Sequence, residues 1–404
     1  MMKKIKVSDY IFKEIQKEKV DFIPIYQSGN ALHLINSVGK NKKIQEFVNY
    51  HEQANGYAAE AYGRFKNLGV CCVGAGPAAT NLSSAVMSSY CDSIPCLFIT
   101  GQVGMFHNKR NRKIRQRGFQ EVDVKNHMKP ITKYSVLVTK VENIRYELEK
   151  CIYIAKSGRP GPVVMDVPFN VQISKIDPSK LRKFITPRKI KPNYTNIFRD
   201  VLREINSSSK PLIIIGGGVQ SVKNNKLLLN FLSKLNIPVV TTWQSSDVLY
   251  YDYNLNLGNA GRSGNRSAIY AIQEADLILS FGCRFTSKVV INEKEFAKNA
   301  KIIAFDIDDA EYKQGLIKFY KGFKVDLKDF IPKFYLYIKN LKFKTTFKDI
   351  WRIRINSLKK NFYKIDETIK TNKKYISPYK FLNNLFDVAS RNAIFIPDAG
   401  MNIT

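Results

Sequence analysis

The stretch VNYHEQANGYAAEAYGRF, residues 48–65, joins the end of a strand pattern to an alanine-rich helix pattern. Phe47, Val48 and Tyr50 are residue types that favour strands. Alanine has the highest helix propensity, and its side chain is small enough for close backbone packing. Glu52 stands at the start of the helix pattern, and a carboxylate beside buried surface is costly unless it has a partner. The stretch therefore predicts a strand-to-helix step with a partnered carboxylate at the junction.

The same step from strand to helix recurs on both sides of this stretch, from about residue 20 to about residue 175. The strand-like runs are VDFIPIY, KIQEFVNY, GVCCVGAG, CLFITG and GPVVMDVP. Strands that alternate with helices predict a parallel sheet covered by helices on both faces. A segment rich in Lys, Pro and Ser follows at about 174–195 and reads as a linker.

A second alternating block extends to about residue 327. Its strand-like runs are KPLIIIGGGVQS, IPVVTTW, ADLILSFG and AKIIAFDID, each an apolar strand followed by a turn, as in a doubly wound sheet. The residues after it are basic and mostly helical in pattern, and AIFIPDAGMNIT reads as a new strand entering a turn. The predicted fold class is α/β, with doubly wound parallel-sheet domains at 1–175 and 190–330. A helical connector and the truncated start of a third α/β domain are expected at 331–404.

The net charge of +31 could indicate a nucleic-acid partner. Lys, Asn and Ile are abundant throughout the chain, however, which favours compositional drift over one basic stripe. The exception is HNKRNRKIRQR at 107–117, with cations at Lys109, Arg110, Arg112, Lys113, Arg115 and Arg117. This run has no interleaved aromatic residues on which single-stranded bases would stack. We therefore expect a solvated loop and no nucleic acid, with binding of an anionic substrate group as the alternative.

Membrane and secretion signals are not expected. We find no apolar run of about 18 uncharged residues, and the start, MMKKIKVSDYIFKEIQ, has no apolar core typical of a signal peptide. The six cysteines lack paired CxxC spacing with histidines, and Cys71 and Cys72 lie in an apolar run. These features favour a reducing cytoplasm as the compartment.

Two glycine-containing turns follow predicted strands. Gly74, Gly76 and Ala79 in VGAGPAATN satisfy the GxGxxA spacing of a dinucleotide site. The acid expected about 20 residues later should end a second strand, but Asp92 precedes one, so a tight turn near some ligand is the stronger interpretation. The triple glycine of IIIGGGVQS fits either a phosphate approach or a simple strand-to-helix turn. The four histidines show no metal-ligand spacing, and HExxH, GxSxG and P-loop motifs are absent.

Taken together, these residues resemble the thiamine diphosphate-dependent enzymes of the acetolactate synthase type, over residues 1 to about 330. HEQANGYAAEAYGR resembles that family's catalytic-glutamate helix, and AGPAATN resembles its SGPGATN turn. Later landmarks are DSIPCLFITGQV, RGFQEVD, PITKYSVLV, SGRPGPVVMDVPFNVQ, PVVTTWQSSDVL, ADLILSFGCRF and AKIIAFDID. The segments SGNALHLINSVG, RQRGFQE and GRSGNRSAIYAIQEAD are more similar to members linked to cell-surface sugar pathways. The resemblance implies a pyrimidine-binding domain followed by a Rossmann-like central domain.

The resemblance also implies roles for single residues. The family's glutamate, matched by Glu52, hydrogen-bonds N1′ of the aminopyrimidine and so promotes loss of the thiazolium C2 proton. Gln120 matches an active-site glutamine, Phe119 an adjacent aromatic residue, and Lys133 a lysine at the substrate channel. Ala78 departs from the family's glycine, and its methyl group would crowd the turn if the turn needs a positive φ. The implied cofactor-binding positions are Gly29, Gly76, Pro77, Thr80 and Asn81, with Gly216, Gly217, Gly218 and Arg284 for a flavin.

The implied cofactors are thiamine diphosphate, Mg²⁺ and possibly FAD. The family holds Mg²⁺ through a GDG…N segment of a third domain, and DAGMN at 398–402 resembles the entrance to that domain. We therefore expect no metal ligands in this chain and little activity from it alone. The expected assembly is a homodimer or tetramer, or a pairing with a full-length homologue.

The reaction implied by the resemblance is decarboxylation of pyruvate and transfer of the two-carbon unit to a second 2-oxo acid, as in branched-chain amino acid biosynthesis. Two alternatives stay open at this point. The acceptor could be a keto-sugar nucleotide used in surface polysaccharide synthesis, or the chain could be a truncated, non-catalytic subunit.

Overall fold

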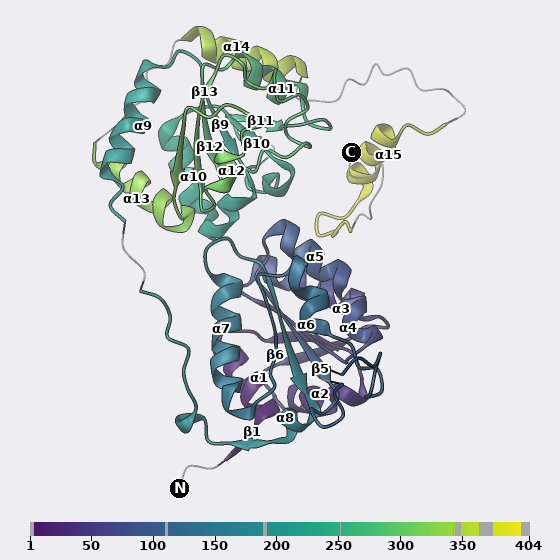
Figure 1. Ribbon diagram of the computed structural model, residues 1–404. Helices are drawn as coiled ribbons and strands as arrows, with labels where there is room; N and C mark the ends of the chain where they lie inside the picture. The colour runs from purple at the N-terminus through teal and green to yellow at the C-terminus, as the bar shows by residue number, and fades with distance from the viewer. Residues whose placement is uncertain are drawn as a thin grey trace. The chain divides into compact units, whose positions relative to one another are not determined.

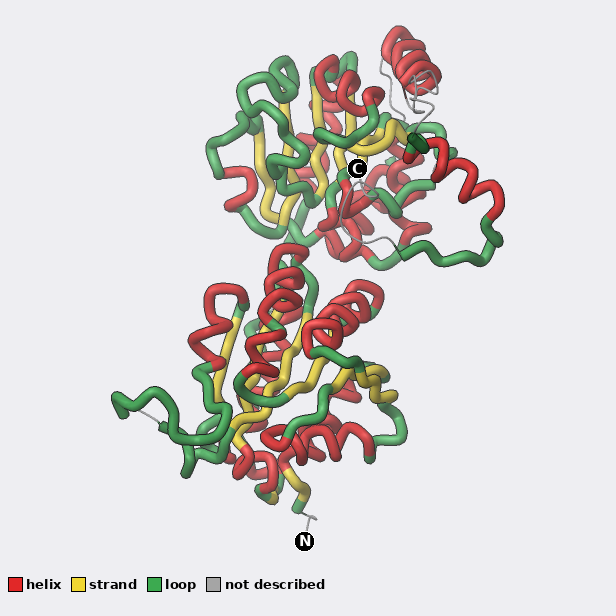
Figure 2. Tube along the Cα trace, turned by 90° about the vertical axis from the view of Figure 1, so that its right-hand side faces the viewer, coloured by secondary structure: helices red, strands yellow, loops and turns green. Residues whose placement is uncertain are grey.

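A computed structural model describes residues 4–109, 112–188, 192–250, 252–341, 343, 349–362 and 375–396. The chain divides into two compact units (Figure 1), an N-terminal unit of Met1–Ile190 and a C-terminal unit of Lys191–Thr404. Each unit contains one six-stranded sheet whose neighbouring strands all pair in parallel. Helices lie on both sides of each sheet (Figure 2). The predicted doubly wound α/β class is therefore confirmed in both units.

The sheet of the N-terminal unit has the strand order β3-β2-β4-β5-β7-β6. Its strands are β2 (Phe22–Ile25), β3 (Gln45–Val48), β4 (Gly69–Val73), β5 (Cys96–Gln102), β6 (Tyr134–Leu137) and β7 (Pro162–Pro168). The chain runs outward from β2 to β3 and then crosses back to β4. The loops after β2 and β4 consequently leave in opposite directions, and ligands of doubly wound sheets bind in the crevice that such a reversal opens at the carboxyl edge.

Two apolar cores lie on opposite faces of this sheet because successive side chains of a strand point to opposite sides. Along β4, Val70 and Cys72 belong to one core, and Cys71 and Val73 belong to the other. The first core is covered by α1 (Val7–Lys17), α2 (Leu32–Gly39) and α7 (Ile144–Lys156). The second is covered by α3 (Glu52–Phe65), α4 (Pro77–Asn81), α5 (Ser83–Asp92) and α6 (Val124–Met128).

Helix α3 lies unusually close to its neighbours, as its small residues predict. A Cβ added at Gly56 would come within 2.5 Å of Ala85 Cβ on α5. A Cβ added at Gly69, the first residue of β4, would overlap the backbone of Ala59 on α3. The backbone of α3 therefore packs on the Ala85 side chain of α5 on one side and on the backbone of β4 on the other.

The stretch predicted as a linker is partly bound to the N-terminal unit. After α8 (Phe169–Ile173), β8 (Lys175–Ile176) pairs antiparallel with β1 (Ile5–Lys6). The Phe184 ring then contacts Tyr146 and Tyr153 on α7, and its backbone N–H donates to Glu149 at 2.7 Å. Aromatic contacts and one hydrogen bond thus fix a segment whose composition indicated only a solvated connection.

The sheet of the C-terminal unit has the strand order β11-β10-β9-β12-β13-β14. Its strands are β9 (Pro211–Ile215), β10 (Val239–Thr241), β11 (Asn256–Asn259), β12 (Leu277–Phe281), β13 (Lys301–Asp306) and β14 (Lys321–Lys324). The helices are α9 (Thr195–Ser207), α10 (Asn225–Leu235), α11 (Arg266–Glu274), α12 (Ala310–Lys313), α13 (Leu327–Asn340), α14 (Asp349–Phe362) and α15 (Pro378–Val388). The buried Trp351 indole donates to the Pro211 carbonyl at 3.0 Å. Helix α14, predicted as part of a solvated connector, therefore packs on the core of this unit.

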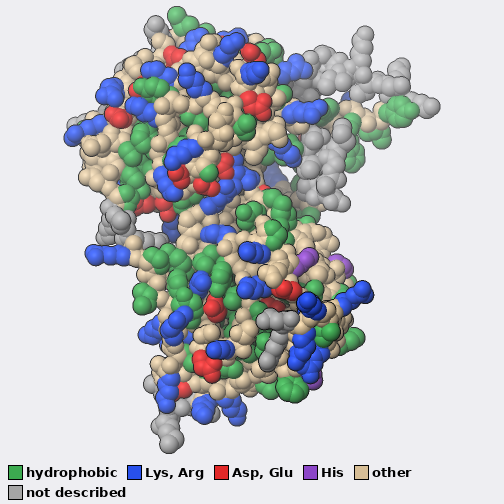
Figure 3. Space-filling view, viewed as in Figure 1, with side chains coloured by type: hydrophobic (Ala, Val, Ile, Leu, Met, Phe, Trp, Pro, Cys, Tyr) green, Lys and Arg blue, Asp and Glu red, His purple; other side chains and the backbone are tan. Residues whose placement is uncertain are grey.

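Surface composition agrees with the basic sequence. Lysine and arginine side chains are spread over the face of both units shown in Figure 3. Within the described ranges, no helix combines the length and apolarity needed to cross a bilayer.

Candidate active site

The loops after β2, β3, β4 and β5 meet at the carboxyl edge of the N-terminal sheet, where the chain reverses direction. A Cβ added at Gly74, just after β4, would overlap Ser28 in the loop after β2. A Cβ added at Gly101 in β5 would overlap the backbone of Asn30. The predicted Gly29 begins the short 3₁₀ turn Gly29–Ala31 in the same loop. The positions predicted from these separate motifs are therefore assembled at one place.

Glu52 is the first residue of α3, and only 8% of it is exposed. The Asn81 side-chain amide, from the end of α4, donates to Glu52 Oε2 at 2.9 Å. No residue in the described part of the chain hydrogen-bonds to the other oxygen, Oε1. One oxygen of the carboxylate is thus fixed by Asn81, and the other is available to a ligand. This explains why an acid occupies a nearly buried position at the start of α3.

The start of α3 is held in place by polar contacts on the preceding loop. His51 is the N-cap, and its Nδ1 accepts from the Gln53 backbone N–H at 3.2 Å. The buried Asn55 amide donates to the Ile25 carbonyl at 2.9 Å, and its oxygen accepts from the Asn49 amide at 2.9 Å. Because these bonds join the β3–α3 loop to the end of β2, the backbone that carries Glu52 is held in place.

Gly76 occupies the sharpest point of the turn after β4. Its φ of +60° and ψ of −126° are open almost only to glycine. An added Cβ would lie 2.6 Å from the Gln120 carbonyl oxygen and 2.8 Å from Gln120 Cβ. Pro77 is the first residue of α4, where its fixed φ suits a helix start. The turn therefore needs glycine at 76 both for its backbone angles and for its contact with Gln120.

The remaining residues of α4 complete this turn. Thr80 Oγ1 donates to the Pro77 carbonyl at 3.0 Å, so the proton of this hydroxyl is used within the helix. Ala78 has helical backbone and no positive φ. The crowding predicted for its methyl group therefore does not arise, because the positive φ falls at Gly76 instead.

Gln120 and Phe119 border the same region from the segment that follows β5. Gln120 has a positive φ of 58° and lies against Gly76. The Phe119 ring is 80% exposed, and its carbonyl accepts from the Asn30 side chain at 3.5 Å. Both predicted residues are thus brought next to the turn, with the aromatic ring directed outward.

Lys133 is not brought to this cluster. It directly precedes β6, so it lies at the amino edge of the sheet, opposite to the carboxyl edge that carries Glu52. Its ammonium group donates to the Ser157 carbonyl at 2.6 Å and to the Ile154 carbonyl, both at the end of α7. Burial lowers the pKa of Lys133 from 10.5 to about 8. Its contacts are those of a helix C-terminal cap.

A buried polar network beneath the site was missed by the sequence reasoning. Asp166 on β7 accepts from Thr100 Oγ1 at 2.7 Å and from the Gln102 amide at 2.9 Å. The same amide donates to the Val122 carbonyl at 2.9 Å. The network therefore fastens the segment just after Gln120 to the centre of the sheet. The signal in the sequence was an acid inside the apolar strand GPVVMDVP, since a buried charge requires partners.

Asp166 predicts a pH dependence of stability. Burial raises its pKa from 3.8 to about 7, and this outweighs the lowering by the hydrogen bonds from Gln102 and Thr100. Between those values the folded state binds more protons than the unfolded state, so its contribution to stability falls as pH rises from about 4 to about 7. Asp166→Asn removes the titration. Urea unfolding of both proteins is measured from pH 4 to pH 8. The free energy of unfolding of the wild type, relative to that of the variant, should fall as pH rises. A difference that stays constant would contradict the raised pKa of Asp166.

The glycines of the C-terminal unit are accounted for by packing. The Gly216 and Gly218 amides donate to Phe281 and Gly282 carbonyls at 2.9 and 3.1 Å, and a Cβ at Gly218 would lie 2.8 Å from Gly282 Cα. Gly217 lies against Gln244, which also accepts from the Arg284 guanidinium at 3.3 Å. With two of three amides used inside the protein, this turn does not fit a phosphate cradle. Flavin binding by this unit stays a prediction, and we derive no step from it.

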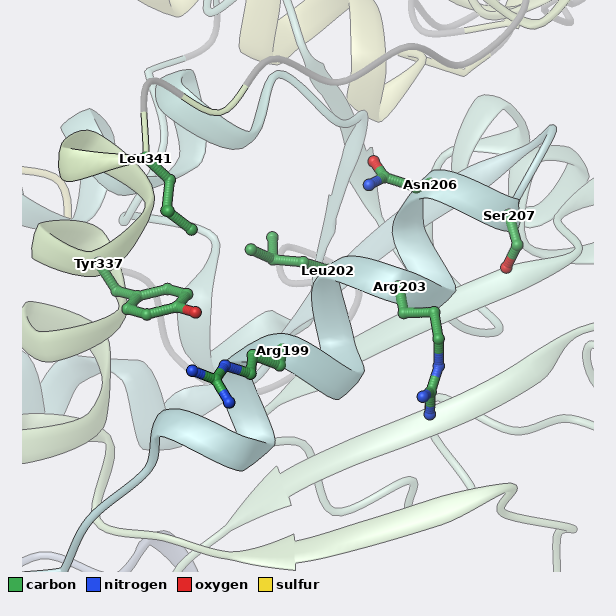
Figure 4. A pocket seen from close by; sticks show the side chains of 7 residues that line it. All are labelled: Arg199, Leu202, Arg203, Asn206, Ser207, Tyr337 and Leu341. Atoms are coloured by element: carbon green, nitrogen blue, oxygen red, sulfur yellow. The ribbon is translucent and has the colours of Figure 1, made fainter.

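A separate hollow lies between α9 and α13 of the C-terminal unit (Figure 4) and has a volume of about 570 Å³. Arg199, Leu202, Tyr337 and Leu341 point toward one another across it. It is wide and shallow, and its residues at the end of α9 precede β9, so it lies at the edge opposite to the glycine turn. It brings together none of the predicted site residues.

The remaining titratable groups that the structure describes do not form a metal centre. Within the described ranges there is no group of three or more His, Cys, Asp or Glu side chains that could hold a metal ion. The His33 ring lies 4.9 Å from Phe169, and Asp92 pairs with Arg64 at the end of α5 rather than at a ribose position. Of the basic run, Arg110 lies outside the described residues, as does the motif at 398–402.

Comparison with known proteins adds two family matches. The thiamine pyrophosphate enzyme N-terminal TPP binding domain matches residues 5–127, and the thiamine pyrophosphate enzyme central domain matches residues 198–321. Glu52, Gly76 and Gln120 all fall within the first match.

Curated relatives agree with the family matches. The chain is 32% identical over 415 residues to a probable acetolactate synthase large subunit of Methanococcus aeolicus, covering 98% of this chain and 67% of that protein. It is 32% identical over 413 residues to the acetolactate synthase large subunit of Lactococcus lactis, covering 99% and 69%. It is 33% identical over 311 residues to a chloroplastic acetolactate synthase of Arabidopsis thaliana, covering 76% and 45%. The chain therefore spans about two thirds of the length of the first two relatives and less than half of the third.

Proposed function

The chain belongs to the thiamine diphosphate (thiamine pyrophosphate)-dependent enzymes of the acetolactate synthase type, and from this membership we propose that it decarboxylates pyruvate and joins the remaining two-carbon unit to an acceptor carbonyl. Two acceptors are compatible with this chemistry, a second 2-oxo acid and a keto-sugar nucleotide, because both present a carbonyl carbon to the two-carbon unit. The observation that carries the proposal is the geometry of Glu52, a nearly buried carboxylate whose Oε2 is held by Asn81 and whose Oε1 has no hydrogen-bond partner among the described residues.

The residues present fit the aminopyrimidine end of the coenzyme. Gly76 presents bare backbone beside Gln120, against which a flat ring can lie. Glu52 Oε1 can accept a hydrogen bond from the ring or, when protonated, donate one to it. The bound coenzyme supplies a cationic ring that accepts the electron pair left when carbon dioxide departs. The role of Glu52 is to hold or release a proton at Oε1 against a ring nitrogen, and Asn81 keeps the other oxygen from rotating into that place.

Further positions around the carboxylate have supporting roles in this proposal. Phe119, exposed at the border, would contact the substrate, and Gln120 would orient it. His51, Asn49 and Asn55 hold the start of α3 and so keep the geometry fixed. No described residue is proposed as a Mg²⁺ ligand, because no described cluster of acids fits one.

Assembly and compartment are part of the same proposal. Five of the six cysteines are buried thiols, which supports a reducing cytoplasm; these are Cys71, Cys72, Cys96, Cys151 and Cys283. The expected assembly is a homodimer or tetramer, or a pairing with a full-length homologue.

Pyruvate labelled with ¹³C at the carboxyl carbon tests the reaction. With thiamine diphosphate and Mg²⁺ present, we expect labelled carbon dioxide together with a new carbon–carbon bond in the product, detected by NMR. Samples without thiamine diphosphate should release none. Carbon dioxide release that yields only free acetaldehyde would contradict carboligation, and no release from protein saturated with the coenzyme would contradict the whole proposal.

A further inference from the structure

The segment that connects β5 to Gln120 combines a defined shape with a high density of positive charge. We call its described residues, 105–109 and 112–117, the basic loop. The loop leaves from the carboxyl end of β5 and returns to Gln120, which lies against Gly76. Both of its ends are therefore anchored at the border of the Glu52 site.

A single carboxylate closes the base of the basic loop. Glu121 accepts backbone N–H bonds from Lys109 at 2.7 Å, from Arg117 at 3.0 Å and from Gly118 at 3.1 Å. The Lys109 ammonium group donates to the Arg115 carbonyl at 3.1 Å. The Arg117 guanidinium lies 5.7 Å from the centre of the Phe106 ring. These contacts give the loop a fixed base, which a merely solvated charge run would not need.

The charge of the basic loop is not balanced locally. No acid occurs between residues 105 and 120, and the first one, Glu121, faces backbone amides. Within the part of the chain that the structure describes, none of four exposed cations forms an ion pair; these are Arg112, Lys113, Arg115 and Arg117. Other arginines of the same unit are paired, Arg64 with Glu60 and Arg145 with Glu149. The basic loop therefore holds uncompensated charge next to the site.

We propose that the basic loop binds the phosphate or diphosphate group of the acceptor substrate, so that the acceptor is a phosphorylated carbonyl compound and not a simple 2-oxo acid. The inference rests on the proposed function, because it assigns the acceptor of that same site. Arginine forms paired hydrogen bonds with phosphate oxygens, and several cations on one loop suit a group with more than one negative charge. A 2-oxo acid carries a single carboxylate and would leave most of these cations unused.

Binding of uridine diphosphate, measured by calorimetry at low salt, tests the charge assignment. The probe variant is Arg112→Gln/Lys113→Gln/Arg115→Gln. The control is Lys40→Gln/Lys42→Gln/Lys43→Gln, which loses the same charge from exposed residues that precede β3 at the amino edge of the sheet. We expect at least about tenfold weaker binding in the loop variant and less than about twofold change in the control, with affinity falling as salt rises. Equal losses in both variants, or no binding by the wild type, would overturn the proposal.

A second experiment distinguishes binding at an acceptor site from binding at the coenzyme site, because the coenzyme also carries a diphosphate. Uridine diphosphate is titrated into protein already saturated with thiamine diphosphate. Binding that persists supports an acceptor site, whereas competition between the two would assign the loop to the coenzyme and overturn the proposal. Preferred binding of a single-stranded oligonucleotide would overturn it as well. Because these readouts need no turnover, an inactive protein that still binds uridine diphosphate would contradict the proposed function alone.

Discussion

Replacing Glu52 by glutamine should slow exchange of the thiazolium C2 proton of bound thiamine diphosphate by about 100-fold or more, with the fold unchanged. Glutamine keeps the size of the side chain, and its carbonyl oxygen can still accept from Asn81, which donates to Oε2 at 2.9 Å. The amide that replaces Oε1 cannot bind and release a proton near neutral pH. The exchange rate is measured by acid quench and proton NMR after transfer of the complex into deuterium oxide.

Glu60 provides the matched control on the same helix. It is also nearly buried, but its Oε1 pairs with Arg64 at 2.6 Å and not with Asn81. Glu60→Gln should therefore lower the free energy of unfolding and leave the exchange rate unchanged. Glu52→Gln should do the reverse, since it slows exchange and leaves the fold unchanged. A Glu52→Gln protein that exchanges at the wild-type rate would remove Glu52 from the proposed proton transfer.

Replacing Gly76 by alanine should lower the free energy of unfolding of the N-terminal unit by about 3 kcal/mol, since a strained φ and a backbone clash add together. The φ of +60° with ψ of −126° disfavours any side chain, and the new Cβ would meet the Gln120 carbonyl at 2.6 Å. Urea unfolding followed by circular dichroism measures the change. Relief of the clash would also push Gln120 away from the turn and weaken coenzyme binding.

Ala78→Gly two residues later is the control for this substitution. Ala78 is helical, so glycine there should cost only about 1 kcal/mol through helix propensity. If the two variants were equally stable, the backbone angles assigned to Gly76 would be wrong.

The α/β fold could be predicted from the sequence because the alternation of strands and helices is visible in local residue patterns, and the packing of the folded chain agrees with those patterns. The site followed only in part. The structure brings Glu52, Gly76 and Gln120 near one another, because loops after parallel strands share the carboxyl edge, and their roles toward the coenzyme stay predictions. Lys133 lies at the opposite edge, since it directly precedes a strand in PITKYSVLV.

Two other features could not be settled by residue type. A run of glycines permits close approach of a ligand or of the protein's own backbone, and at Gly216 and Gly218 the backbone of Gly282 takes that space. The partner of Glu52 is 29 positions away in the chain, at Asn81, and a hydrogen bond of that kind depends on the packing of α3 against α4. Sequence identified the chemistry of these residues, and the structure supplied their neighbours.

The close packing of α3 gives the site two parts that differ in how much they can change: the start of α3, which carries Glu52, and the loop after β5. With Gly56 against Ala85 and Ala59 against Gly69, the helix cannot slide or turn, so the proton-handling end of the pocket cannot adapt to new compounds. In the loop that begins after Gln102, the described residues 112–117 are all exposed. Diversification of substrate range in such proteins is therefore expected to accumulate in that loop, while the acid at the start of α3 stays where it is.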